Sequence, residues 1–247
     1  MALIDDKIQS QVKEAFQLLG KPVKLLMFTQ EIECEFCAMA RQLLEEVTAL
    51  SEKMTLEVKD FVKDAEEVKR YGIDKIPAIV VMGEKDYGIR FYGLPAGYEF
   101  TTLIEDILVV SRDDHDLTPE VVAELAKIDG PVHLQVLISP SCPYCSQAVA
   151  AAHRFAMASD FIRADMVETS EFPHLAVKYN VQGVPLTVIN ETYRVAGSLP
   201  EIDFAREILK ALGKMVAEEE APPAATEPGP SVAADAGGEK KPGGTPE

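Results

Sequence analysis

The 247-residue sequence has no tryptophan, only four cysteines and four histidines, and few basic residues. It contains 24 Lys and Arg against 41 Asp and Glu, which gives a net charge of −17 at pH 7. Nucleic acids and anionic membranes bind clustered Lys and Arg, so this balance excludes them as main partners. No apolar run approaches the roughly 20 residues of a membrane span, and the first residues lack the pattern of a secretion signal. We therefore expect a soluble, cytoplasmic protein.

The last 31 residues, 217–247, differ in composition from the rest of the chain. They contain six Pro and five Gly, with no large apolar side chain beyond Val232. Seven acidic and two basic residues give this segment a net charge of −5. Such a segment buries too little apolar surface to offset the entropy of ordering it. The composition predicts a disordered acidic tail.

The remaining chain contains an internal repeat, which is its most informative feature. The repeat shows in four pairs of landmarks, each separated by 108 residues: Cys34 and Cys142, Cys37 and Cys145, Tyr71 and Tyr179, and Ile76-Pro77 and Val184-Pro185. We therefore expect two domains, 1–113 and 114–216, joined near the segment RDDHDLT (112–118).

Both copies show the same order of hydrophobic patterns. In the first copy, a helical stripe is followed by a buried strand at 23–28, and a strongly periodic helix closes the unit. The second copy begins with Thr118 as an N-cap and Pro119 in the first helical position, followed by a strand at 132–138. The order helix, strand, helix, strand, helix, strand, strand, helix predicts an α/β fold in which a mixed central sheet is flanked by helices.

The four cysteines form two Cys-x-x-Cys pairs, for which three interpretations are open. A disulfide across one turn closes a very small loop, so it would stabilise the fold little. Two such pairs can bind zinc, but here each pair follows a buried strand and opens a helix. A helix N-terminus stabilises a thiolate, which favours redox chemistry. On that interpretation Cys34 and Cys142 attack substrate, while Cys37 and Cys145, one turn into the helix, resolve the mixed disulfide.

A proline follows the first cysteine of each pair by 43 residues. X-Pro bonds are the only peptide bonds that become cis at modest cost, so Pro77 and Pro185 are candidate cis prolines. The spacing leaves an ordinary strand-starting proline equally open. Between the cysteines, Phe36 and Tyr144 are expected to shape the rim of each site and contact substrate, with helix packing as the alternative for Phe36.

The cysteine pairs, together with YGIDKIPA (71–78) and YNVQGVPL (179–186), resemble the thioredoxin superfamily. The doubled arrangement is similar to the two-domain protein disulfide oxidoreductases, also called glutaredoxin-like proteins. The resemblance covers residues 3–213 and implies two tandem thioredoxin-like domains with a nucleophilic first cysteine. It also implies that a cis-proline loop faces each disulfide and binds substrate, so that Ile76 and Pro77 belong to the first site and Val184 and Pro185 to the second.

The resemblance further implies a dithiol–disulfide oxidoreductase that acts on protein disulfides without a bound cofactor or metal. Its partners would be disulfide-containing proteins and a thioredoxin reductase as electron donor. One alternative is a dedicated electron carrier from a thioredoxin reductase to a peroxidase. An alternative of another class is a metal-binding or scaffold module whose cysteines do not turn over.

Two departures from the family concern the donor and the proton-transfer acid. The chain lacks the Thr-Val-Pro step and the Gly-Gly-x-Asp cap of glutathione-dependent glutaredoxins, which argues against glutathione as the dedicated donor. Six residues before the first cysteines, where thioredoxins commonly have a buried acid, stand Phe28 and Val136. Other candidates for proton transfer, all expected mainly at the surface, are Glu31, Lys59, Asp60 and Asp165.

The two sites differ in local charge. Glu31, Glu33 and Glu35 surround Cys34, whereas uncharged residues flank Cys142. Nearby carboxylates disfavour a thiolate. Because a stabilised thiolate stabilises the reduced form, we expect the second site to be the stronger oxidant and the first site the stronger reductant.

Overall fold

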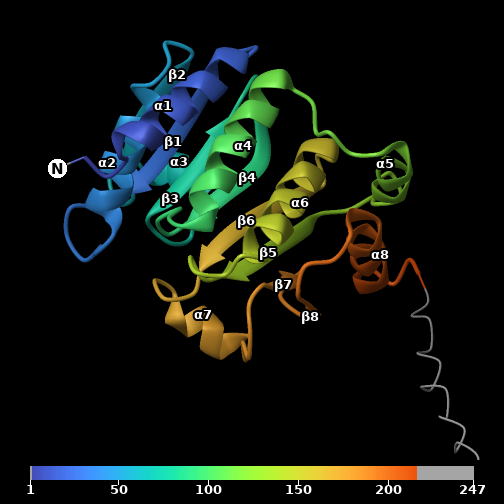
Figure 1. Ribbon diagram of the computed structural model, residues 1–247. Helices are drawn as coiled ribbons and strands as arrows, with labels where there is room; N and C mark the ends of the chain where they lie inside the picture. Colours follow the sequence, from blue (N-terminus) through green and yellow to red (C-terminus); the bar gives the residue numbers. More distant parts are fainter. Residues whose placement is uncertain (1, 216–247) are drawn as a thin grey trace, which may run out of the picture. The chain divides into compact units, whose positions relative to one another are not determined.

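The computed structural model describes residues 2–215, so the tail expected at 217–247 lies outside the described residues. Eight strands and eight α-helices follow one another in the described part (Figure 1). The elements of the first repeat are α1 (Asp6–Ala15), a 3-10 turn η1 (Phe16–Leu18), β1 (Val23–Thr29), α2 (Cys37–Thr48), β2 (Met54–Asp60), α3 (Ala65–Arg70), β3 (Ala78–Met82), β4 (Asp86–Tyr92) and α4 (Tyr98–Arg112). Those of the second are α5 (Pro119–Leu125), β5 (Val132–Ile138), α6 (Cys145–Ala158), β6 (Ile162–Glu168), α7 (Pro173–Lys178), β7 (Leu186–Ile189), β8 (Tyr193–Ala196) and α8 (Glu201–Ala211).

Both repeats contribute to one continuous sheet, whose strand order is β2-β1-β3-β4-β6-β5-β7-β8. Strands β3 and β7 run antiparallel to their neighbours, and the other adjacent pairs are parallel. The repeats meet where β4 pairs with β6 in parallel, with Ile89 opposite Ala164 and Phe91 opposite Met166. The mixed α/β architecture expected from the sequence is confirmed, while the domain boundary at 113 and 114 stays a prediction.

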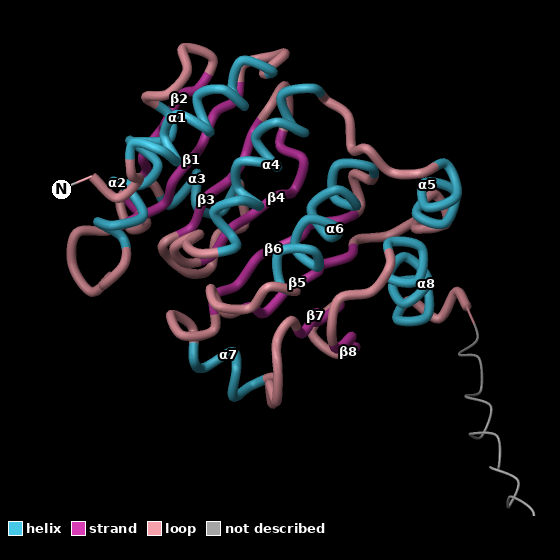
Figure 2. Tube along the Cα trace, in the orientation of Figure 1, coloured by secondary structure: helices cyan, strands magenta, loops and turns pink. Residues whose placement is uncertain are grey.

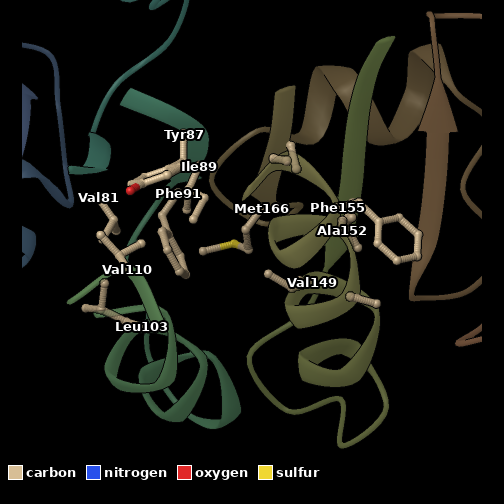
Figure 3. Close-up of a cluster of buried hydrophobic side chains, with 14 of the residues drawn as sticks. Val81, Tyr87, Ile89, Phe91, Leu103, Val110, Val149, Ala152, Phe155 and Met166 are labelled. Carbon is tan, nitrogen blue, oxygen red and sulfur yellow. The ribbon is translucent and has the colours of Figure 1, made fainter. Parts of the chain in front are cut away.

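Hydrophobic side chains cover both faces of this sheet. One buried cluster joins α1, α2, α4, α5, α6 and α8 to one face and is continuous across the two repeats. Figure 3 shows its centre, where Phe91 of β4 and Met166 of β6 lie side by side between Leu103 of α4 and Val149 of α6. A smaller cluster on the opposite face includes Leu175 of α7 and receives Val68 of α3 at its margin. Each repeat therefore packs against the other as well as against its own helices.

The strand directions place both cysteine pairs at one edge of the sheet. Strands β1 and β5 run the same way, because β1 and β4 are both antiparallel to β3, and β4, β6 and β5 are parallel. The loops after β1 and β5 therefore leave the sheet at the same edge, while the segment that joins α4 to α5 passes the other end (Figure 2). Three strands separate β1 from β5, so these strands lie about 19 Å apart at the usual spacing of about 4.8 Å.

Some fold details differ from the sequence prediction or extend it. Thr118 caps α5 as expected, since its Oγ1 accepts a hydrogen bond from the Val121 amide. Strand β8 takes the place of the last strand in the order predicted for each copy, although its own segment has a weak pattern, because Tyr193–Ala196 is short and only Val195 in it is buried. Within residues 2–215, no helix combines the length and apolarity that crossing a membrane requires.

Candidate redox sites

Each cysteine pair forms a disulfide at the end of a buried strand. The first redox site is the Cys34–Cys37 disulfide after β1, with its Cα atoms 5.4 Å apart. The second redox site is the Cys142–Cys145 disulfide after β5, with Cα atoms 5.5 Å apart. Part of the sequence prediction is wrong, because α2 and α6 begin at the second cysteine of each pair rather than one turn before it. Both sulfurs nevertheless lie near a helix N-terminus, which favours negative charge there.

The two cysteines of each pair differ in exposure. Cys34 and Cys142 are half-buried, whereas Cys37 is 2% exposed and Cys145 is 0% exposed. An external disulfide therefore reaches the first sulfur of each pair, and the second is available only from within the protein. An attacking thiol must be accessible to substrate and a resolving thiol must be protected from it, and the two cysteines of each pair differ in this way.

The Ile76–Pro77 and Val184–Pro185 peptide bonds are both cis, which decides between the alternatives left open by the sequence. Phe28 pairs with Ala78 and Leu137 pairs with Leu186, so each proline step enters its strand beside the strand that carries the cysteines. At the second site, Cys142 Sγ lies 3.6 Å from the carbonyl oxygen of Val184.

The rims of the two sites differ. Tyr144, which caps α6, is 66% exposed, whereas Phe36, which caps α2, is half-buried. A cavity of about 600 Å³ opens beside the first site, with Cys34, Arg41 and Asp60 in its wall. The three glutamates that surround Cys34 in the sequence are all exposed: Glu31, Glu33 and Glu35.

Three of the candidates for proton transfer do not fit a buried acid at either disulfide. Glu31 is exposed, and Lys59 is paired with Glu57 at 2.8 Å. Hydrogen bonds from the Lys63 and Val62 amides lower the pKa of Asp60, so its carboxylate stays ionised.

The sequence places Asp165 at the surface, and this prediction is wrong, because the residue is 0% exposed. Burial opposes its ionisation, but hydrogen bonds and charge from His133 and Arg163 outweigh burial and lower its pKa to about 2. It pairs with Gln135, three residues before the end of β5, so it lies away from the edge that carries the cysteines.

The structure contains a further buried acid, Glu99, which is not among the candidates predicted from the sequence. Glu99 in the first turn of α4 is 0% exposed, and neither carboxylate oxygen has a hydrogen-bond partner among the described residues. Burial raises the pKa of Glu99 to about 7. One signal is present in the sequence, since Glu99 precedes the core residue Leu103 by four positions and therefore shares its buried helix face.

Two contacts align the start of α4, which carries Glu99, with the start of α6. The Tyr98 amide at the start of α4 donates to the Pro140 carbonyl, two residues before Cys142. Two turns further along, Asp106 Oδ2 lies 2.6 Å from His153 Nδ1, two turns into α6. Helices α4 and α6 therefore run side by side in the same direction, and Glu99 lies level with the first turn of α6, which begins at Cys145.

Residues 132–210 match the thioredoxin domain family. The F subunit of alkyl hydroperoxide reductase from Escherichia coli (strain K12) is 24% identical over 217 residues, which cover 88% of this chain and 40% of that protein. The chain thus spans two fifths or less of the length of the first curated relatives that it matches.

Two solved structures resemble both repeats together. A protein disulfide oxidoreductase from Aeropyrum pernix K1 has a TM-score of 0.80 at 28% identity, covering 87% of this chain and 98% of its own. The NTD_N/C domain of alkylhydroperoxide reductase AhpF from Enterococcus faecalis has a TM-score of 0.77 at 25% identity, covering 83% of this chain and 99% of its own. The second repeat therefore matches the thioredoxin domain family, and the two repeats together have the tandem thioredoxin-like fold of these solved structures.

Proposed function

We propose that the protein is a dithiol–disulfide oxidoreductase that acts on protein disulfides at both redox sites. The observation that carries this proposal is the pairing, in each repeat, of one accessible and one buried sulfur at a helix start beside a cis-proline step. This arrangement lets a substrate reach the attacking sulfur while the resolving sulfur waits out of reach. The exposed rim residue Tyr144 and the backbone of Ile76 and Val184 are proposed to contact the substrate.

The reduction proceeds by two sulfur exchanges, written here for the second site. The Cys142 thiolate attacks one sulfur of the substrate disulfide, forms a mixed disulfide and releases the other substrate sulfur as a thiolate. The Cys145 thiolate then attacks Cys142 Sγ, which restores the Cys142–Cys145 disulfide and releases the second substrate thiol. Two electrons pass from the protein to the substrate, and each released thiolate takes up a proton. Glu99 accepts the proton that Cys145 loses, because an acid with a pKa near neutrality exchanges protons readily at physiological pH.

A second candidate function is electron transfer from a reductase to a peroxidase. It is favoured by the match to part of the F subunit of alkyl hydroperoxide reductase, whose name places that protein in peroxide reduction. On this proposal a reductase of the thioredoxin reductase type reduces the disulfides, and a peroxidase with its own disulfide is the substrate. The chemistry at the cysteines is the same, and only the partner differs.

Insulin reduction by dithiothreitol tests the oxidoreductase proposal, with wild type, Cys142→Ser and Cys34→Ser compared at equal concentration. We expect each variant to lose the activity of its own site and the double variant to lose all activity. Trapping on Cys145→Ser then identifies the partner, because removing the resolving thiol leaves the mixed disulfide intact. A peroxidase among the trapped proteins supports the carrier function, whereas stoichiometric zinc without reductase activity overturns both.

A further inference from the structure

Two consecutive amides after β4 link the first redox site to the second repeat. The Gly93 amide donates to the carbonyl oxygen of Pro77, the cis proline of the first site, at 3.0 Å. The next amide, that of Leu94, donates to Oε1 of Glu171 at 2.6 Å. Glu171 lies in the loop between β6 and α7, so a side chain of the second repeat fixes the backbone that contacts Pro77.

The approach of Glu171 depends on the absence of a side chain at Gly93. Gly93 has a φ of +96°, and a Cβ there would lie 2.8 Å from Glu171 Oε1 and 2.9 Å from the Cβ of Glu168. Both distances are shorter than real Cβ contacts. The second carboxylate oxygen, Oε2 of Glu171, is buried and lacks a hydrogen-bond partner within the described part of the chain.

The loop that carries Glu171 forms the same turn as its equivalent in the first repeat, but the residue at the position of Glu171 differs between the two repeats. Glu168 accepts hydrogen bonds from the amides of Ser170 and Glu171. In the first repeat Asp60, 108 residues earlier, accepts from the amides of Val62 and Lys63, and Lys63 is exposed. The turn therefore does not require a glutamate at this position, and the one in the second repeat faces the other repeat.

Two carboxylates among the described residues act electrostatically on Glu171. Glu168 adjoins it in the same loop, and Glu35 stands between the two cysteines of the first redox site. Burial and, to a smaller extent, the charges of Glu168 and Glu35 together raise the pKa of Glu171 to about 7, against the Leu94 hydrogen bond. Glu171 is thus close enough to the first site to exchange electrostatic influence with it.

We propose that Glu171 of the second repeat is a positioning residue of the first redox site, holding the Pro77 loop through Leu94 and adding negative charge beside Cys34. The inference rests on the proposed thiol–disulfide exchange. An ionised Glu171 disfavours the Cys34 thiolate, and this effect disappears when Glu171 takes up a proton. The reactivity of the first site therefore depends on an acid that its own repeat does not contain.

The test uses the full chain with Cys142→Ser and Cys145→Ser, so that only the first site reacts. After reduction, the rate at which iodoacetamide alkylates Cys34 is measured between about pH 5.5 and 9, where thiolate reactivity is resolved. Glu171→Gln keeps an oxygen acceptor for Leu94 but removes the charge, and Glu171→Ala removes both. Glu120→Gln, on the exposed surface of the second repeat, is the control for net charge.

We expect Glu171→Gln to raise the alkylation rate about 3- to 10-fold between about pH 7 and 8, below the ordinary thiol pKa of about 8.5, and to match wild type near pH 5.5, where Glu171 is already neutral. Glu171→Ala should in addition reduce the rate at which the first site reduces insulin, because the Pro77 loop loses its support. Identical pH profiles for wild type, Glu171→Gln and Glu120→Gln overturn the proposal. Alkylation measures the reactivity of Cys34 whether or not the protein reduces a substrate. If the wild-type protein does not reduce insulin, the proposed function is refuted, but this test of Glu171 remains valid.

Discussion

Replacing Glu99 by Gln should stabilise the protein and impair its second redox site. The pKa of Glu99 is raised by burial from 4.5 to about 7, so between these values the folded state binds a proton that the unfolded chain releases. Stability from this group is therefore present below the unfolded pKa and lost as pH rises through the folded pKa. A shift of one pKa unit corresponds to about 1.4 kcal/mol, so ionisation of Glu99 lowers the free energy of unfolding by about 3 kcal/mol at about pH 8 and by less than about 1 kcal/mol at about pH 5.

Glutamine does not titrate, so the variant avoids this cost. Glu99→Gln should be more stable than wild type by about 3 kcal/mol at about pH 8, with a much smaller gain at about pH 5. The amide cannot accept the proton of Cys145, so reduction at the second site should fall about 100-fold, within the usual contribution of a general base. Stability and activity would then change in opposite directions.

Urea unfolding at the two pH values measures the first effect, and insulin reduction in a Cys34→Ser background measures the second. Glu105→Gln is the matched control, because Glu105 is exposed on the same helix and its loss changes net charge equally. A gain in unfolding free energy that is the same at both pH values would refute the buried titration. Unchanged second-site activity in Glu99→Gln would refute its role as proton acceptor.

The local charges predict a higher reduction potential at the second site than at the first. The two potentials are measured by equilibrating variants in which Cys→Ser substitutions leave only one site intact with glutathione buffers. A higher potential at the first site contradicts the charge argument. Gly97→Ala should destabilise the fold by about 1–3 kcal/mol in denaturant unfolding, because Gly97 has a φ of +60° and a Cβ would lie 2.3 Å from the Pro140 oxygen. Gly130→Ala is the control, because a Cβ added at Gly130 would meet no atom within 4 Å. An equal loss of unfolding free energy in both variants would refute the steric explanation. Because the strands that carry the two sites lie about 19 Å apart, electrons should pass between the sites only through another molecule, so the transfer rate should rise with protein concentration. A rate that does not change on dilution would show direct transfer.

Much of each repeat could be predicted from local sequence. The Thr118-Pro119 start of α5 follows from the chemistry of a helix N-terminus, and the apolar runs of β1 and β5 mark buried strands. The cysteine spacing and the recurring proline identified both redox sites, because disulfide exchange needs two sulfurs within reach. These features depend on residues close in sequence, or on a repeat that makes distant residues comparable.

The features that could not be predicted depend on contacts between residues far apart in the sequence, which leave no local sequence pattern. The sequence places Asp165 at the surface because a carboxylate rarely lies buried without partners. Arg163 lies two residues before Asp165 on β6, but its second partner, His133, becomes a neighbour only through the pairing of β5 with β6. The pairing of β4 with β6 could not be predicted from the sequence either, since both strands have the composition of ordinary core strands. That pairing sets α4 beside α6 and so brings Glu99 level with the first turn of α6, which begins at Cys145.

The shared sheet makes the two repeats less independent than their periodicity suggests. Glu99, from the first repeat, lies level with Cys145 and is placed there by the contacts of Tyr98 with Pro140 and of Asp106 with His153. Glu171, from the second repeat, reaches the backbone beside Pro77 of the first site. A 108-residue repeat predicts two copies of one site, because it compares each residue with its equivalent in the other copy. The two acids proposed to act on the disulfides instead come from the opposite copy, so on these proposals the two sites differ in the groups that control their protons and charge.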